Sequence, residues 1–108
     1  MSAAKAYTAK VIFTGDQWLH QHAAIVADGI ITDVLPVTAL HPLTEIIDFG
    51  DNILAPAFID LQIYGAFEKL FAVYPDTNSL QLLNSYSNNG GAAFCMPTIA
   101  TNHTRYTL

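Results

Sequence analysis

Basic residues are scarce in this sequence: four Lys and Arg stand against nine Asp and Glu, giving a net charge of −5. Proteins that bind nucleic acid without sequence preference, or that lie on anionic lipid, need a basic surface. We therefore expect neither nucleic acid nor a membrane as a partner. Charged residues make up only 12% of the chain, against 52% hydrophobic residues. This imbalance predicts that further protein packs against the chain to cover its apolar surface.

Cysteine occurs once, at Cys95, which excludes an internal disulfide. Cys95 lies in an apolar run, and this predicts a thiol packed in the core. No stretch approaches the roughly 20 apolar residues of a membrane-spanning helix, and residues 1–10 lack the apolar segment of a secretory signal. From these absences we expect a cytoplasmic location.

The first half of the chain has the pattern of short antiparallel strands. Residues 6–13 alternate in the way that predicts a half-buried strand. Two apolar segments, residues 23–27 and 30–35, flank Asp28-Gly29, a dipeptide that favours the positive φ angles of a two-residue type I′ turn. A β-hairpin is therefore expected there, and residues 44–49 predict one more strand. Together these segments indicate an antiparallel layer over the first fifty residues.

The second half has the pattern of a strand, a helix and a strand. Residues 53–64 are almost continuously apolar, which is typical of a strand covered on both faces. A helix is expected from residue 77 to about Asn88, and residues 92–96 predict a second apolar strand. This order is that of a βαβ unit with parallel strands. A complete (β/α)₈ barrel takes about 250 residues, so this chain would hold only its opening unit after a β-layer.

The limits of the expected helix follow from local chemistry. Residues 77–79 can cap its N-terminus, and Asn89-Gly90-Gly91 can end it, since glycine accepts a left-handed backbone. Leu80, Leu83 and Tyr86 recur on one helical face and predict its buried side.

Two blocks of the second half resemble a known protein family. Residues 55–62, Ala-Pro-Ala-Phe-Ile-Asp-Leu-Gln, resemble the pattern P-G-F/L-I-D-x-H/Q on the first barrel strand of the amidohydrolase superfamily. Gln62 and Tyr64 stand where most members carry a metal-binding His-x-His. The branch with Gln at the first position is the N-acetylglucosamine-6-phosphate deacetylases, and residues 91–101 resemble that branch's pattern G-x-T-x-x-L/M-P-T-x-x-T.

The chain departs from these patterns at three places. Ala57 replaces a glycine, Ala93 stands where threonine is common, and residues 66–68 (Ala-Phe-Glu) replace a glycine-rich loop. Loop glycines allow positive φ or close backbone approach. Phe67 and Glu68 therefore predict either a loop of different shape or a protein in which this loop no longer keeps the geometry needed for activity.

The resemblance implies an α/β fold in two parts. Residues 1–53 would form an antiparallel β-layer that is part of a small β-sandwich, completed by later strands. Residues 54–108 would form strand 1, helix 1 and strand 2 of an incomplete (β/α)₈ TIM-type barrel.

The resemblance also implies an activity. The complete enzyme would hydrolyse N-acetylglucosamine 6-phosphate, a phosphorylated amino sugar, to glucosamine 6-phosphate and acetate, with a bound divalent metal (zinc or iron). It would form a homodimer. The family's metal ligands and catalytic acid/base lie on later barrel strands, beyond Leu108. We therefore expect no catalytic residue, no metal ligand, no bound metal and no activity in this chain alone.

Gln62 and Tyr64 are the candidate substrate-binding residues. Gln62 falls at the C-terminal end of a barrel strand, where such enzymes build their sites, and Tyr64 points to the same side at i+2. Asp60 shares that alternation, and we leave open whether it holds a neighbouring loop or serves chemistry. Glu68 and Lys69 are interpreted as a solvated pair.

The histidines invite a metal hypothesis, because His20 and His22 have the i, i+2 spacing that brings two imidazoles to one side of a strand. We interpret them as surface or turn residues instead. His41 precedes a proline and is expected in a loop, and His103 lies near the end of the sequence.

Two other functions compete with the deacetylase interpretation. One is another amidohydrolase, dihydroorotase-like or imidazolone-hydrolysing, which Gln62 in place of histidine disfavours. The other is a non-catalytic β-rich interaction module, which the hairpin at Asp28-Gly29 would suit. The apolar strands expected at residues 53–64 and 92–96 disfavour the module, because a free-standing domain would leave them uncovered.

Overall fold

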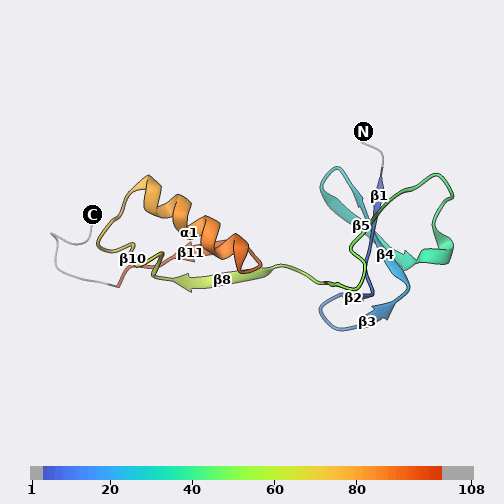
Figure 1. Cartoon of the computed structure of the whole chain (residues 1–108), viewed down its shortest axis with the longest axis horizontal. Helices are drawn as coiled ribbons and strands as arrows, with labels where there is room; N and C mark the ends of the chain where they lie inside the picture. The colour runs from blue at the N-terminus through green and yellow to red at the C-terminus, as the bar shows by residue number, and fades with distance from the viewer. Residues whose placement is uncertain (1–3, 101–108) are drawn as a thin grey trace. The chain divides into compact units, whose positions relative to one another are not determined.

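A computed structural model describes residues 4–100 and divides after Pro56 into two compact units, which are described separately (Figure 1). In chain order the elements are β1 Lys5–Thr8, β2 Val11–Phe13, β3 Trp18–His20, β4 His22–Ala27, β5 Ile30–Pro36, the 3₁₀ helix η1 Val37–Ala39, β6 Glu45–Asp48, β7 Ile53–Leu54, β8 Phe58–Ile63, β9 Gly65–Ala66, β10 Lys69–Leu70, α1 Thr77–Asn89 and β11 Ala92–Pro97. No helix in the described range is long and apolar enough to cross a membrane. The two domains expected at residues 1–53 and 54–108 stay a prediction.

The first unit consists of two small sheets, ordered β5-β4-β1-β6 and β3-β2-β7. The pairs β1/β4, β4/β5 and β2/β3 are antiparallel, as predicted. The pairs β1/β6 and β2/β7 are parallel, so the prediction of a purely antiparallel layer is wrong. The reason is that β6 and β7 pair with strands far away in the sequence, and no short turn dictates their direction.

The strand predicted over residues 6–13 is in fact two strands, β1 and β2, in different sheets. Lys10 lies in a bend between them, and its backbone N–H donates to the carbonyl oxygen of Gly50 at 2.8 Å. On either side of the bend, Ala6 and Ile12 are buried. Alternation in the sequence located these buried positions but gave no sign of the bend.

The hairpin predicted at Asp28-Gly29 is confirmed. Strands β4 and β5 pair antiparallel, with Ala27 opposite Ile30. Asp28 and Gly29 have φ angles of 50° and 78°, and positive φ at both central residues is the mark of a type I′ turn.

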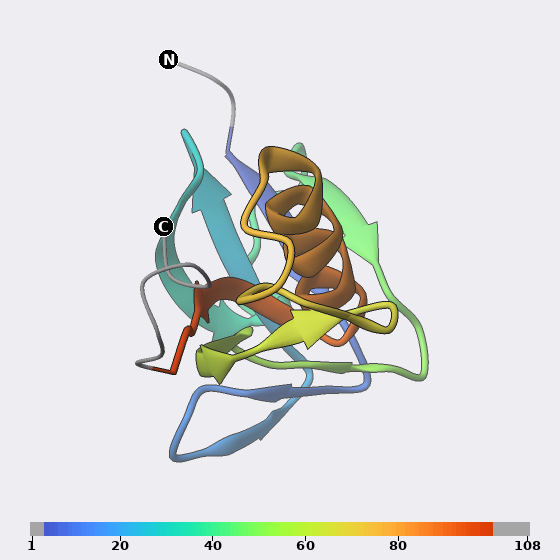
Figure 2. The same ribbon diagram turned by 90° about the vertical axis from the view of Figure 1, so that its left-hand side faces the viewer.

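In the second unit, the predicted βαβ unit is confirmed. Strands β8 and β11 pair in parallel, and α1 contacts both β11 and β9. Figures 1 and 2 show the helix lying along one face of the strand pair. The single strand predicted over residues 53–64 is wrong, because the chain leaves the extended ladder at residues 55–57. Pro56 has no N–H to donate and restricts the residue before it.

The core of this unit is a cluster of Ile63, Ala66 and Leu83, with Phe71 and Cys95 packed against it. The expected core position of Cys95 therefore holds, although its side chain is only partly buried.

The helix buries a different face from the one predicted. Leu83 is buried as expected, but Leu80 and Tyr86 are exposed. The other buried positions are Ser79 and Ser87, which lie four residues on either side of Leu83. Small side chains at these positions let the helix approach the strands closely, and a rule based on apolar residues misses them.

Asp76 caps the helix, not residues 77–79 as predicted. Its side chain accepts the backbone N–H of Ser79 with an oxygen-to-nitrogen distance of 2.7 Å, and its φ and ψ of −124° and 166° are those of an extended residue before a helix. This hydrogen bond to the carboxylate lowers the pKa of Asp76. The expected glycine ending is confirmed, since Gly90 follows the last helical residue and Gly91 has a φ of 91°.

Strands β9 and β10 form a tight hairpin between β8 and the helix, with Ala66 opposite Lys69. Its two turn residues, Phe67 and Glu68, have φ angles of 50° and 63°. Such angles are costly for residues with a Cβ, so the hairpin has a left-handed turn that glycine would adopt more easily. The two alternatives predicted for a loop without glycine, a different shape or a loss of the active geometry, stay predictions.

The cap at Asp76 predicts a pH-dependent contribution to stability. A folded-state pKa below the ordinary 3.8 means that the contribution is present above about pH 4 and is lost as the pH falls through the folded-state pKa. The melting temperature of the wild type should therefore exceed that of Asp76→Ala at neutral pH, and this difference should shrink in acid. Asp76→Asn keeps a hydrogen-bond acceptor that does not titrate, so its difference from Asp76→Ala should stay constant. If the difference in melting temperature between the wild type and Asp76→Ala does not change with pH, the carboxylate does not have the proposed role.

The β9–β10 turn predicts a stabilising substitution. Glu68→Gly removes a Cβ strain of about 1–2 kcal/mol at positive φ, and the greater flexibility of glycine in the unfolded chain offsets about 0.4–1 kcal/mol of this gain. The free energy of unfolding should therefore rise by up to about 1 kcal/mol in urea titrations. Phe67→Gly relieves the same strain but loses the edge-to-face contact with Tyr86, whose ring centroid lies 5.7 Å away. It should therefore gain less than Glu68→Gly. If Glu68→Gly destabilises the protein, the turn is not left-handed in solution.

Candidate functional site

The candidate site lies at the C-terminal end of β8. In sheets of parallel strands, binding sites form beyond the carboxyl ends of the strands. Gln62 lies at that end and Tyr64 directly follows β8. Both side chains are exposed. The structure therefore brings together the two residues that the sequence singled out.

An irregularity in the strand pairing coincides with Gln62. Asp60 pairs with Cys95 and Ile63 pairs with Pro97, so two residues of β8 oppose a single residue of β11. This is the pattern of a β-bulge, which bends the strand and re-aims a side chain, and which is frequent beside active sites. The sequence gave no signal for this bulge.

Two hydrogen bonds hold Gln62 in place. Its backbone N–H donates to Oδ1 of Asp60 at 3.0 Å, and its side-chain Nε2 donates to Oη of Tyr64 at 2.5 Å. Asp60 thus holds the backbone of Gln62 itself, which favours the structural role that the sequence left open. The hydrogen bond between Gln62 and Tyr64 was missed, although their i, i+2 spacing was the signal that could have predicted it.

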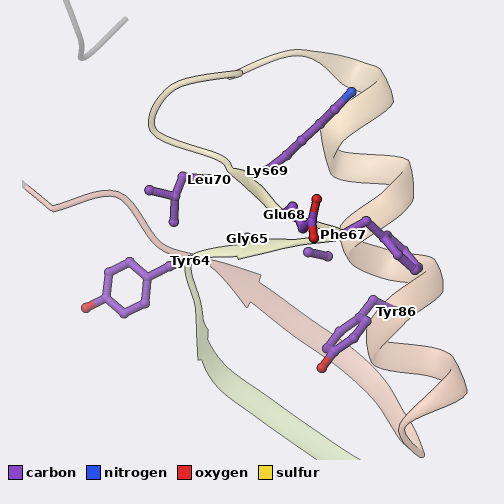
Figure 3. Close-up of a pocket in the computed structure, with 8 residues that line it drawn as sticks. Tyr64, Gly65, Phe67, Glu68, Lys69, Leu70 and Tyr86 are labelled. Atoms are coloured by element: carbon purple, nitrogen blue, oxygen red, sulfur yellow. The ribbon is translucent and has the colours of Figure 1, made fainter.

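A hollow of about 450 Å³ adjoins this end of the strand (Figure 3). Its lining residues are Tyr64, Gly65, Ala66, Phe67, Glu68, Lys69, Leu70 and Tyr86. In Figure 3, Tyr64 extends away from α1, whereas Phe67 and Tyr86 lie against each other on the helix side. Tyr64 borders this hollow directly, and Gln62 is connected to it through the hydrogen bond to Tyr64.

The shape of the hollow depends on Gly65. A Cβ built on Gly65 would collide with the backbone carbonyl oxygen of Lys69, so any side chain there would push the two strands of the β9–β10 hairpin apart. Lys69 was expected to form a solvated pair with Glu68. Both residues are exposed, as that interpretation expects, and the ammonium of Lys69 also lies over the ring of Tyr74, 5.7 Å from the centroid, as in a weak cation–π contact.

The described residues do not supply a metal site of their own. Among residues 4–100, no three His, Cys, Asp or Glu side chains come close enough together to hold a metal ion. Nδ1 of His22 lies 2.7 Å from the carbonyl oxygen of His20, and Nδ1 of His41 accepts the N–H of Leu43 at 3.2 Å. These contacts are local turn contacts, as expected. His103 lies outside the described residues. Gln62 offers a single amide oxygen, so the described part of the chain does not fit a divalent metal without ligands from elsewhere.

The shifted pKa values of the first unit belong to strand pairing. A hydrogen bond and ion pair with Glu45, at 3.0 Å, raise the pKa of Lys5. The backbone N–H of Gly50, and then the hydroxyl of Thr8, lower the pKa of Asp48. The contacts of Lys5 with Glu45 and of Thr8 with Asp48 connect the neighbouring strands β1 and β6. The contact of Gly50 with Asp48 belongs to the turn that follows β6.

The first unit also contains an apolar hollow of about 600 Å³. It is lined by Tyr7, Ile12, Phe13, Thr14, Ala24, Val26, Ile31, Val34, Phe49, Leu54, Ala55 and Pro56. None of these side chains is an acid, a histidine or a cysteine. The hollow therefore suits packing rather than chemistry.

Comparison with known proteins agrees with the resemblance seen in the sequence. Residues 6–54 match the family model of the NagA composite domain. Over 91 residues, 84% of its length, the chain is 30% identical to N-acetylglucosamine-6-phosphate deacetylase of Haemophilus influenzae, and this match covers 24% of that protein.

Solved structures extend the agreement to the fold. The crystal structure of N-acetylglucosamine-6-phosphate deacetylase from Pasteurella multocida matches 95% of this chain at a TM-score of 0.84 and 26% identity. A mutant of the Mycobacterium smegmatis enzyme, in complex with N-acetyl-D-glucosamine-6-phosphate, matches 97% at a TM-score of 0.80 and 15% identity, which shows the fold alone. Each match covers 27% of the solved chain. The chain is therefore similar over most of its length to N-acetylglucosamine-6-phosphate deacetylases, and it spans about a quarter of the length of the relatives that it matches.

Proposed function

We propose that this chain is the N-terminal part of an N-acetylglucosamine-6-phosphate deacetylase. The observation that carries the proposal is the likeness to the Pasteurella multocida enzyme over 95% of the chain, at a TM-score of 0.84. The complete protein would hydrolyse N-acetylglucosamine 6-phosphate to glucosamine 6-phosphate and acetate. It would act in the cytoplasm as a homodimer, with zinc or iron bound by residues outside this chain.

A (β/α)₈ barrel beginning at β8 is part of this proposal, as is a small β-sandwich that includes the first unit. The parallel pair β8/β11 supports it, because parallel strands are normally covered on both faces. Large apolar side chains of this pair are instead more than half exposed, namely Phe58, Ile59, Leu61, Phe94 and Met96. Further strands and helices of the same barrel would cover them.

The proposed reaction is hydrolysis of an acetamide. Water adds to the acetyl carbonyl carbon, the carbon–nitrogen bond breaks, and the departing nitrogen takes a proton to become the amine of glucosamine 6-phosphate. A bound divalent metal supplies polarisation of the carbonyl and a more acidic water. From this chain, Gln62 and Tyr64 contribute polar groups at the strand end. The proton-transferring carboxylate and the metal ligands would come from later strands.

The rival functions have less support. A dihydroorotase-like or imidazolone-hydrolysing enzyme would share the barrel strand but not the matched relatives, which are deacetylases by name. A closed interaction module would need its apolar strands covered within the chain. The exposed apolar side chains of β8 and β11 argue against that.

The proposal predicts where activity resides. The full-length protein with Zn²⁺ or Fe²⁺ should release acetate from N-acetylglucosamine 6-phosphate, measured by a coupled acetate assay. The 108-residue chain under the same conditions should release none, because the proposal assigns the acid/base and the metal ligands to residues outside it. Turnover by the isolated chain would contradict the assignment of the catalytic groups to later strands, and an inactive full-length protein would contradict the function.

The proposal also predicts a role for Gln62 in the full-length protein. Gln62→Ala should lower kcat/KM roughly 10- to 100-fold, as is typical when a residue close to a metal site is removed. Gln81, which is exposed on helix α1, provides the matched control, and Gln81→Ala should leave kcat/KM unchanged. Equal activity of the two variants would show that Gln62 does not line the active site.

A further inference from the structure

The hydrogen bond between Gln62 and Tyr64 has a direction that matters for chemistry. A glutamine amide has a donating end, Nε2, and an accepting end, Oε1. In this structure Nε2 donates to Oη of Tyr64. One of the two N–H groups of Nε2 is therefore occupied within the protein, and the accepting end is left for a ligand.

The surroundings of Gln62 fix the rest of its geometry. Asp60 binds its backbone N–H, and the bulge in β8 determines where the side chain leaves the strand. An exposed glutamine would otherwise sample many rotamers. The hydrogen bond to Tyr64, whose side chain has only two rotatable torsions, restricts the side chain of Gln62 to the rotamer that reaches the hydroxyl.

We propose that Tyr64 is a positioning residue, which turns the amide of Gln62 so that Oε1 faces the reacting groups as a hydrogen-bond acceptor. This inference rests on the proposed function. Its partner would be a proton donor of the reaction, either the acetamide N–H of the substrate or the attacking water. Where most amidohydrolases carry two separate imidazoles, this chain would use two polar residues that act as one unit.

Tyr64→Phe in the full-length protein tests the inference, because it removes a single oxygen atom from an exposed side chain. The variant should lower kcat/KM roughly 10-fold, in line with other positioning contacts. A rise in KM with kcat unchanged would identify the substrate N–H as the partner of Gln62. A fall in kcat with KM unchanged would identify the attacking water. Tyr74→Phe removes the hydroxyl of a comparably exposed tyrosine (48% against 45% for Tyr64) and should change neither constant.

A double-substitution cycle separates positioning from direct contact. If Tyr64 acts through Gln62, the double variant of Gln62→Ala and Tyr64→Phe should be no slower than Gln62→Ala alone. Multiplicative losses would mean that the Tyr64 hydroxyl serves the substrate by itself, and they would overturn the inference.

A spectroscopic measurement tests the contact without relying on activity. The two side-chain amide protons of Gln62 should shift in NMR spectra of Tyr64→Phe, while those of Gln81 stay in place. Unchanged Gln62 resonances would overturn the inference. If the resonances shift but the full-length protein has no deacetylase activity, the contact between Gln62 and Tyr64 is supported and the proposed function is wrong.

Discussion

The parallel pairing of β8 with β11 is the constraint on which the second unit depends. Two parallel strands cannot be joined by a tight turn, so the chain must cross over the sheet, and here it does so through the β9–β10 hairpin and α1. The same pairing brings both carboxyl ends to one edge. There the backbone N–H of Thr98 still donates to the carbonyl oxygen of Ile63 at 2.8 Å. Gln62 and Tyr64 lie at this edge because β8 runs parallel to β11. Their own side chains do not determine the direction of the strand.

The turn beside this edge has a backbone conformation that suits glycine, although no glycine occupies it. The resemblance to deacetylases led us to expect glycine after the first barrel strand, where this chain has Phe67 and Glu68. Both residues nevertheless adopt positive φ, and Gly65 remains where a side chain would collide with the opposing strand. The glycine that avoids a collision is therefore present. Glycine, which would ease the turn, is absent at residues 67 and 68, at a cost of about 1 kcal/mol or more per residue.

Local chemistry explains which parts of the fold could be predicted. The turn at Asp28-Gly29 and the glycine ending of the helix depend on a few adjacent residues, and both were predicted correctly. The bend at Lys10 and the direction of β6 depend on partners forty residues away in the sequence, so no local pattern could show them. The cap at Asp76 was missed by one residue, because several neighbouring polar residues are equally able to cap a helix.

The candidate site also has a part that the sequence predicted and a part that it could not predict. Strand position was enough to select Gln62 and Tyr64, but the bulge and the hydrogen bond that orient them follow from pairing with β11. Enzymes built on (β/α)₈ barrels draw their catalytic groups from the ends of several strands. One pair of strands can then supply an oriented acceptor without supplying a metal site or an acid. The proposed barrel would account in this way for a polar strand end beside exposed apolar faces.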